Sequence, residues 1–159
     1  MRYLIFLFFL FSFFYQCEKP NREVKVLSQD SRTTLLQIFT ENEKVNEQLF
    51  KSDTILPDVS SILEIVTEAK NKVKEPGVLA YLGKMEENLK GLDNTKREEY
   101  LKSFSDFSIN LAELNKMYGV ASDYNRFFCP MVMKTWVKKG KEIKNPYASD
   151  MRNCGEIVK

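Results

Sequence analysis

The residues with the clearest potential for chemistry are sulfur side chains near the end of the chain. Cys129 and Cys154 lie 25 positions apart, and three of the six methionines lie between them, namely Met131, Met133 and Met151. Thiolate and thioether sulfur are soft ligands that favour soft metal ions, above all Cu(I). The chain has no histidine, so the commonest protein metal ligand is absent. A metal site on this segment would therefore be built from sulfur.

Two other roles are open to the same cysteine pair. In an oxidising compartment, a disulfide between Cys129 and Cys154 would stabilise the fold by about 3 kcal/mol through the loop that it closes. Two buried thiols with no role beyond packing are the third alternative. The chain has no Cys-x-x-Cys pair, which argues against thioredoxin-type chemistry. Spacing alone leaves all three alternatives open.

The N-terminus has the pattern of an export signal. Residues 1–16 begin with one basic residue and continue with an apolar run of about a dozen residues, too short to span a bilayer as a helix. Cys17 follows, as in the lipobox of bacterial lipoproteins, although the preceding Tyr15 and Gln16 are larger than usual. We expect a signal peptide over 1–16, and a lipidated Cys17 with a flexible tether over 17–30. The lipid would anchor the protein to a bacterial membrane, on its periplasmic or cell-surface face. An uncleaved anchor or an ordinary signal peptide is the alternative.

Four segments between residues 31 and 119 have apolar residues at helical spacing. They run from Leu35 to Leu49, from Val59 to Val73, from Val78 to Leu92 and from Tyr100 to Tyr118, and Asn42 is the one polar residue on their apolar stripes. The connections are short, which favours antiparallel neighbours. We expect a mainly α fold, with an up-and-down four-helix bundle over 31–119. A small irregular or β-hairpin lobe over 120–159 would pack on the bundle as part of one domain.

Local patterns give two finer predictions. Residues 133–137 and 142–143 are expected to pair as a hairpin around the Lys-Lys-Gly-Lys sequence of 138–141, with Cys129-Pro130 at its entrance. Thr95 and Glu98 have the spacing of a capping box, which predicts that Thr95 caps the fourth helix.

Composition excludes several classes of function. Net charge is only +2, and the excess of basic residues after residue 125 fits either a basic face for an acidic partner or solvated lysines. Basic and aromatic residues do not interleave as they do in nucleic-acid readers, so no nucleic-acid partner is expected. No nucleophile with an evident base and no spaced carboxylate pair is visible, so we do not expect an enzyme.

The end of the chain resembles a known family. The resemblance is carried by Cys129-Pro130-Met131, Trp136, Ile143, Asn145-Pro146-Tyr147 and Met151 through Cys154-Gly155. This pattern is similar to a bacterial periplasmic domain of unknown function. The domain occurs alone in exported proteins and lipoproteins, and fused to the C-terminus of the periplasmic adaptor proteins of copper/silver efflux pumps. The resemblance extends over roughly residues 33–158, and its C-terminal motif is the specific part.

The resemblance implies a role in copper or heavy-metal handling. It implies Cu(I) ligands at Cys129, Met131, Met151 and Cys154, with Met133 as a further candidate, and site-shaping roles for Pro130, Trp136, Asn145, Pro146, Tyr147 and Gly155. The metal would be sequestered or passed to a partner, either an efflux-pump adaptor or a metal-donor protein. Phe128 departs from the family pattern, because many members have histidine there, and this makes the expected site all-sulfur. The alternative is a structural or interaction lipoprotein with a Cys129–Cys154 disulfide and no metal.

Overall fold

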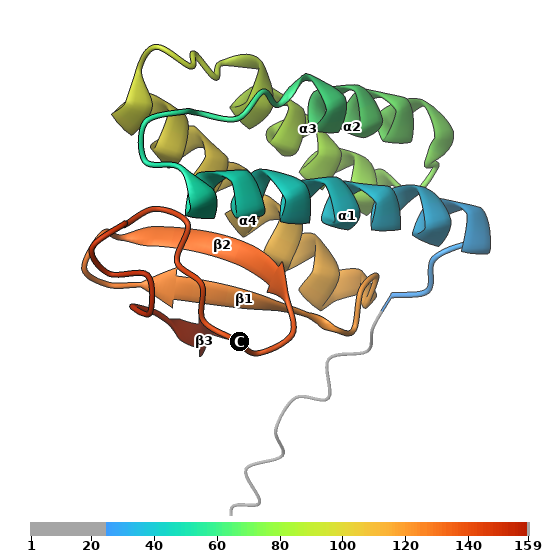
Figure 1. Ribbon diagram of the computed structural model, residues 1–159. Helices are drawn as coiled ribbons and strands as arrows, with labels where there is room; N and C mark the ends of the chain where they lie inside the picture. Colours follow the sequence, from blue (N-terminus) through green and yellow to red (C-terminus); the bar gives the residue numbers. More distant parts are fainter. Residues whose placement is uncertain (1–24, 159) are drawn as a thin grey trace, which may run out of the picture.

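The computed structural model describes residues 25–158 as four helices followed by a small antiparallel sheet (Figure 1). The helices are α1 (Gln29–Lys51), α2 (Ser60–Lys72), α3 (Pro76–Lys90) and α4 (Arg97–Tyr118). The strands are β1 (Tyr124–Cys129), β2 (Lys134–Lys139) and β3 (Glu156–Val158). The expected mainly α fold is confirmed. The expected signal peptide and the lipidation site at Cys17 lie outside the described residues.

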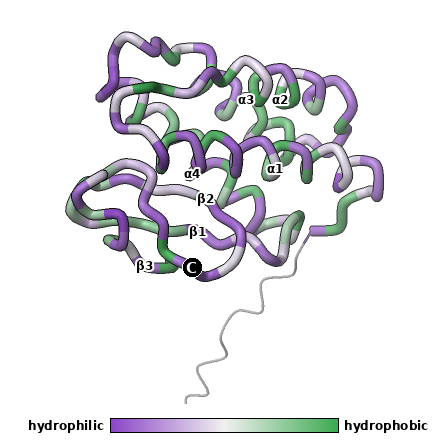
Figure 2. The backbone as a smooth tube through the Cα atoms, viewed as in Figure 1, coloured by the Kyte–Doolittle hydropathy of each residue, from purple (hydrophilic) through white to green (hydrophobic). Residues whose placement is uncertain are grey.

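The helices pack in chain order, and the sheet lies against the first and the last of them. Each helix contacts the next one along the chain, and α1 and α4 both contact β2. In Figure 1, α1 and α4 lie between the sheet and the other two helices, α2 and α3. Hydrophobic and hydrophilic residues alternate along the helices in Figure 2, as amphipathic packing requires. The buried stripes continue into the sheet, so helices and lobe share one hydrophobic core.

The helix ends show which local sequence signals determine where each helix begins and ends. Ser28 caps α1 by accepting a hydrogen bond from the Ser31 backbone N–H at 3.1 Å, so the helix begins inside the expected tether. The predicted capping role of Thr95 is wrong. Its backbone N–H and hydroxyl both donate to Asp93, which forms a local turn instead. Gly119 ends α4 in the left-handed conformation, with φ of 58°.

The sheet has the strand order β2-β1-β3. The predicted pairing of 133–137 with 142–143 is wrong, because β2 pairs with the preceding strand, with Phe127 opposite Trp136 and Cys129 opposite Lys134. Met133 adopts a left-handed φ of 52° in the turn that joins β1 to β2. The chain after β2 runs without regular structure until β3, which pairs with the other side of β1. Cys129 therefore ends β1, Met131 and Met133 occupy the hairpin turn that follows it, and Met151 and Cys154 lie on the approach to the edge strand β3.

Candidate functional site

Cys129 and Cys154 form a disulfide. It joins the end of β1 to the segment that leads into β3, with the two Cα atoms 5.7 Å apart, a usual separation for such a bond. Cys129 is completely buried, whereas Cys154 is partly exposed. Of the three alternatives for this pair, the structure has the disulfide. A disulfide is typical of proteins in oxidising compartments outside the cytoplasm.

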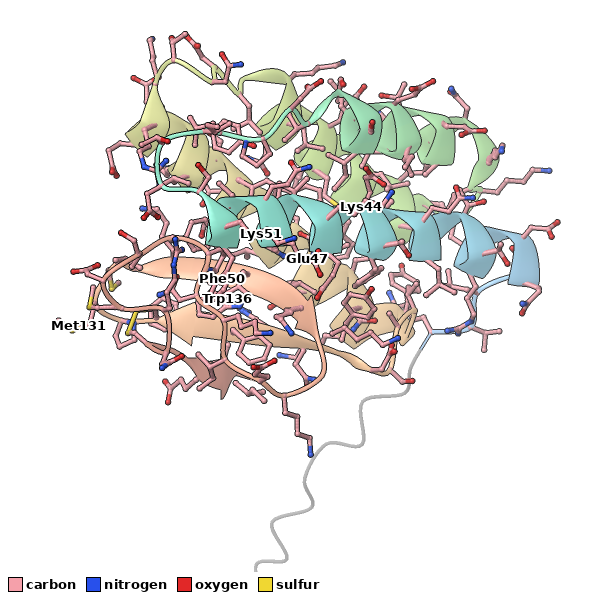
Figure 3. The ribbon with its side chains drawn as sticks, viewed as in Figure 1. Lys44, Glu47, Phe50, Lys51, Met131 and Trp136 are labelled. Carbon is pink, nitrogen blue, oxygen red and sulfur yellow. A yellow bond between two sulfur atoms is a disulfide. The ribbon has the colours of Figure 1, made fainter. Side chains whose placement is uncertain are left out.

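The predicted methionine ligands lie on the two segments that the disulfide joins. Met131 and Met133 occupy the β1–β2 turn, and each side chain is 70% exposed. Met131 projects outward at one edge of the molecule in Figure 3. Met151 is partly exposed in the turn before Cys154, whose backbone N–H donates to the Met151 carbonyl at 2.9 Å. We call this set the sulfur end: Cys129, Met131, Met133, Met151 and Cys154.

The disulfide determines what the sulfur end offers a metal. Each cysteine sulfur is bonded to the other, so the predicted site of two thiolates and two thioethers does not fit the disulfide form. That form offers thioethers alone. Among the described residues, no group of three or more His, Cys, Asp or Glu side chains is placed to hold a metal ion. A thiolate site at the sulfur end therefore requires the reduced form of the cysteine pair.

Asn145 organises the segment that carries Met151 and Cys154. Its side chain is completely buried. The amide oxygen accepts from the Tyr147 backbone N–H at 2.9 Å, and the amide nitrogen donates to the Cys154 carbonyl at 3.2 Å. Its backbone N–H donates to the Arg152 carbonyl at 2.8 Å, and the Arg152 guanidinium donates back to the Asn145 carbonyl. One buried residue thus ties both ends of this turn together.

Trp136 packs its ring against the segment between β2 and β3, through Tyr147 and Gly155. Its ring is completely buried, stacked on Phe127 at a centroid distance of 5.4 Å, with Tyr147 edge-on at 6.3 Å. Gly155 passes close to the indole, where an added Cβ would lie 2.5 Å from the Trp136 Cη2 atom. Its φ of 148° also favours glycine. Packing therefore explains why the motif has tryptophan at position 136 and glycine at position 155.

Of the remaining predicted site-shaping residues, Tyr147 packs against the Trp136 ring. Tyr147 donates its hydroxyl to the Thr135 carbonyl at 3.0 Å, and burial raises the pKa of this phenol. Pro146 is buried beside it, whereas Pro130 is exposed at the start of the β1–β2 turn.

Helix side chains cover the outer edge of β2, which sequence reasoning did not anticipate. Asn42 and Asn46 each donate to the Val137 carbonyl at 2.8 Å, in place of a strand partner. Only Asn42 had a signal in the sequence, as a polar residue on an apolar stripe. Asn46 occupies the next helical turn and had no such signal.

Two further residues complete this edge. Ser105 on α4 accepts from the Thr135 backbone N–H at 2.8 Å, and Glu43 on α1 accepts from the Lys139 backbone N–H at 3.1 Å. Burial raises the pKa of Glu43, against the lowering effect of that hydrogen bond. Neither role could be predicted from the sequence, because each residue bonds to a strand that is far away along the chain.

Carboxylates neutralise much of the positive charge of the C-terminal lobe. Basic groups within 4.0 Å of a carboxylate are Arg126, Lys138, Lys139, Lys144 and Arg152. The Arg152 guanidinium also lies over the Phe50 ring, 4.9 Å from its centroid. These pairs argue against a dedicated basic face for an acidic partner.

Comparison with protein-family models, with curated proteins and with solved structures finds no match to this chain. Within residues 25–158, no helix is both long enough and apolar enough to cross a membrane. The chemistry of the sulfur end is therefore the basis for inferring function.

Proposed function

We propose that the protein is an exported lipoprotein that binds Cu(I), or a similar soft ion, at the sulfur end. The ion is cargo, to be sequestered or handed over to an efflux partner. The observation that carries this proposal is the 70% exposure of both Met131 and Met133 directly after Cys129. Large apolar side chains are usually buried, and two exposed thioethers beside a cysteine pair give a soft ion accessible donors. The resemblance of the C-terminal motif to a copper-associated domain supports the same function.

The two redox forms of the sulfur end differ in their donors. The disulfide form has only neutral thioethers, from Met131, Met133 and Met151. Reduction adds two thiols on backbones 5.7 Å apart, close enough to serve one ion. Thiolates bind soft ions far more strongly than thioethers do, and each thiol releases its proton when it binds the ion as a thiolate. We therefore expect tight Cu(I) binding by the reduced protein and weak binding by the oxidised one.

A competition assay with a Cu(I) chelator tests this proposal. We expect reduced wild-type protein to take up one Cu(I) at least about 100-fold more tightly than the Cys129→Ser/Cys154→Ser variant, because thiolates are the strongest donors present. Met131→Leu/Met151→Leu keeps both cysteines and should weaken binding about tenfold through loss of thioether donors. Met117→Leu, outside the sulfur end, is the matched control and should change nothing. Equal affinity of wild type and the double-serine variant would reject the proposal.

A second candidate is a lipid-anchored structural or interaction domain that holds no metal. The complete burial of Cys129 favours it, because a buried sulfur in a disulfide needs no further role than to cross-link the fold. The same assay separates the two candidates. If reduced wild type competes for Cu(I) no better than the double-serine variant, the structural function remains.

A further inference from the structure

We infer that the Cys129–Cys154 disulfide is opened by a dithiol reductant that attacks Cys154, and that the domain stays folded and keeps both thiols side by side. This opening would regulate the proposed metal site, and its purpose rests on the proposed function. The inference itself rests on the contacts that hold each cysteine independently of the bond between them.

Cys129 is held by the sheet. It is the last residue of β1, opposite Lys134 of β2, and its side chain belongs to the shared hydrophobic core. The same strand pairs with β3 through Phe127 and Phe128, opposite Ile157 and Glu156. None of these contacts passes through the disulfide, so the position of Cys129 does not depend on it.

Cys154 is held by Asn145 and by its own turn. The Asn145 amide donates to the Cys154 carbonyl at 3.2 Å, and the Cys154 backbone N–H donates to the Met151 carbonyl at 2.9 Å. Gly155, the next residue, lies against the Trp136 indole. These contacts fix Cys154 from both sides. Reduction therefore leaves a pre-organised pair of thiols rather than a loose loop.

The difference in exposure between Cys129 and Cys154 determines which of the two sulfur atoms the reductant attacks. Cys154 is partly exposed and Cys129 is completely buried, and access decides which sulfur a thiolate reaches. A thiolate of the reductant forms a bond to the Cys154 sulfur, the S–S bond breaks, and Cys129 leaves as a thiolate that takes up a proton. The second thiol of the reductant then attacks its own sulfur in the mixed disulfide and releases the Cys154 thiol. The reductant is oxidised to a disulfide, and the protein gains two electrons and two protons.

The partner has a defined chemical class. A dithiol closes its own ring and completes the reaction, whereas a monothiol leaves a mixed disulfide on the protein. An exported dithiol oxidoreductase therefore fits as the physiological partner, and dithiothreitol is its laboratory substitute. Opened in this way, the sulfur end changes from a cross-link into a pair of ligands.

Opening of the disulfide is tested without copper. The protein is reduced with dithiothreitol, and amide NMR spectra and amide hydrogen exchange are recorded. We expect shifts confined to the residues around the sulfur end, and retained protection of the β1–β3 hydrogen bonds. Reoxidation by an excess of oxidised glutathione, which is reduced to two molecules of glutathione, should be first order in protein, with a rate constant independent of protein concentration. Collapse of the spectrum, loss of β3 protection, or disulfide-linked dimers on reoxidation would overturn the inference.

The site of attack is tested by trapping. Limited glutathione, followed at once by alkylation of the thiol that it frees, should leave a mixed disulfide that peptide mass mapping places on Cys154, and adducts on Cys129 would contradict the proposed direction. Asn145→Ala should slow intramolecular reoxidation at least about tenfold, because the two thiols lose effective concentration. If that variant does not fold, Arg152→Ala is used instead. It removes the hydrogen bond from the Arg152 guanidinium to the Asn145 carbonyl and should slow reoxidation less. An unchanged rate in Asn145→Ala, or in Arg152→Ala where Asn145→Ala does not fold, would refute the positioning role of Asn145. Since no readout uses copper, failure here is distinguishable from failure of Cu(I) binding.

Discussion

Gly155→Ala is expected to lower the free energy of unfolding by about 2–4 kcal/mol, through overpacking and backbone strain. The added Cβ would lie 2.5 Å from the Cη2 atom of Trp136, which is completely buried and cannot move aside freely. The φ of 148° at this position adds backbone strain for any residue with a side chain. The substitution would disrupt the packing of Gly155 on Trp136, which positions the neighbouring Cys154 beside Cys129.

Urea unfolding of matched glycine variants separates the two causes. Gly140→Ala keeps a positive φ of 74° but has open space around the Cβ, so it carries the backbone penalty alone, about 1 kcal/mol. Gly83→Ala lies inside α3 with no close atom, and should stabilise the protein by up to about 1 kcal/mol. A loss at Gly155 no larger than the loss at Gly140 would show that the Trp136 contact has no energetic weight.

Cys129→Ala/Cys154→Ala is expected to lower the free energy of unfolding by about 3 kcal/mol in oxidising buffer. The disulfide closes a loop with a sequence separation of 25, and the constraint acts mainly on the unfolded chain. The variant should still unfold cooperatively, because the sheet and Asn145 hold the two segments without the bond. Chemical denaturation of both proteins, each in oxidising and in reducing buffer, measures the effect.

The reducing arm provides the internal control for this variant. Reduced wild type and the double-alanine variant should differ by less than about 1 kcal/mol, since neither carries the cross-link. Loss of a cooperative transition in both would contradict the view that the scaffold holds the sulfur end on its own.

The helical part of the fold was predictable because its signal is local. Apolar stripes of period 3.6 recur in each helix, and the stripe residues are buried as that pattern requires, except Leu92, which lies past the end of α3 and is half-buried. The strands carried a weaker signal. The end of the helical pattern at residue 119 was predicted, but Tyr124–Cys129 mixes polar and aromatic residues without clear alternation, so it was not recognised as a strand. The hairpin was placed at the Lys-Lys-Gly-Lys sequence, whereas the turn lies at the left-handed Met133.

The sequence left the disulfide between Cys129 and Cys154 as one of three alternatives, and the ligand role of the methionines stays a prediction. Cys129 and Cys154 meet, and the methionines lie on the segments that they join, as the motif indicated. Their redox form depends on the compartment and on the geometry between distant segments, which spacing does not contain. Asn46 and Ser105 were missed for a related reason, because they bond to a strand that is distant in the sequence.

The central claim is that the reduced sulfur end holds Cu(I) through sulfur alone. X-ray absorption at the copper edge of the reduced, Cu(I)-loaded protein after gel filtration tests it most directly. We expect one retained copper per chain with only sulfur atoms as nearest neighbours, and the loss of that copper in Cys129→Ser/Cys154→Ser. Nitrogen or oxygen neighbours in place of sulfur, or no copper retained by the reduced wild-type protein, would contradict it.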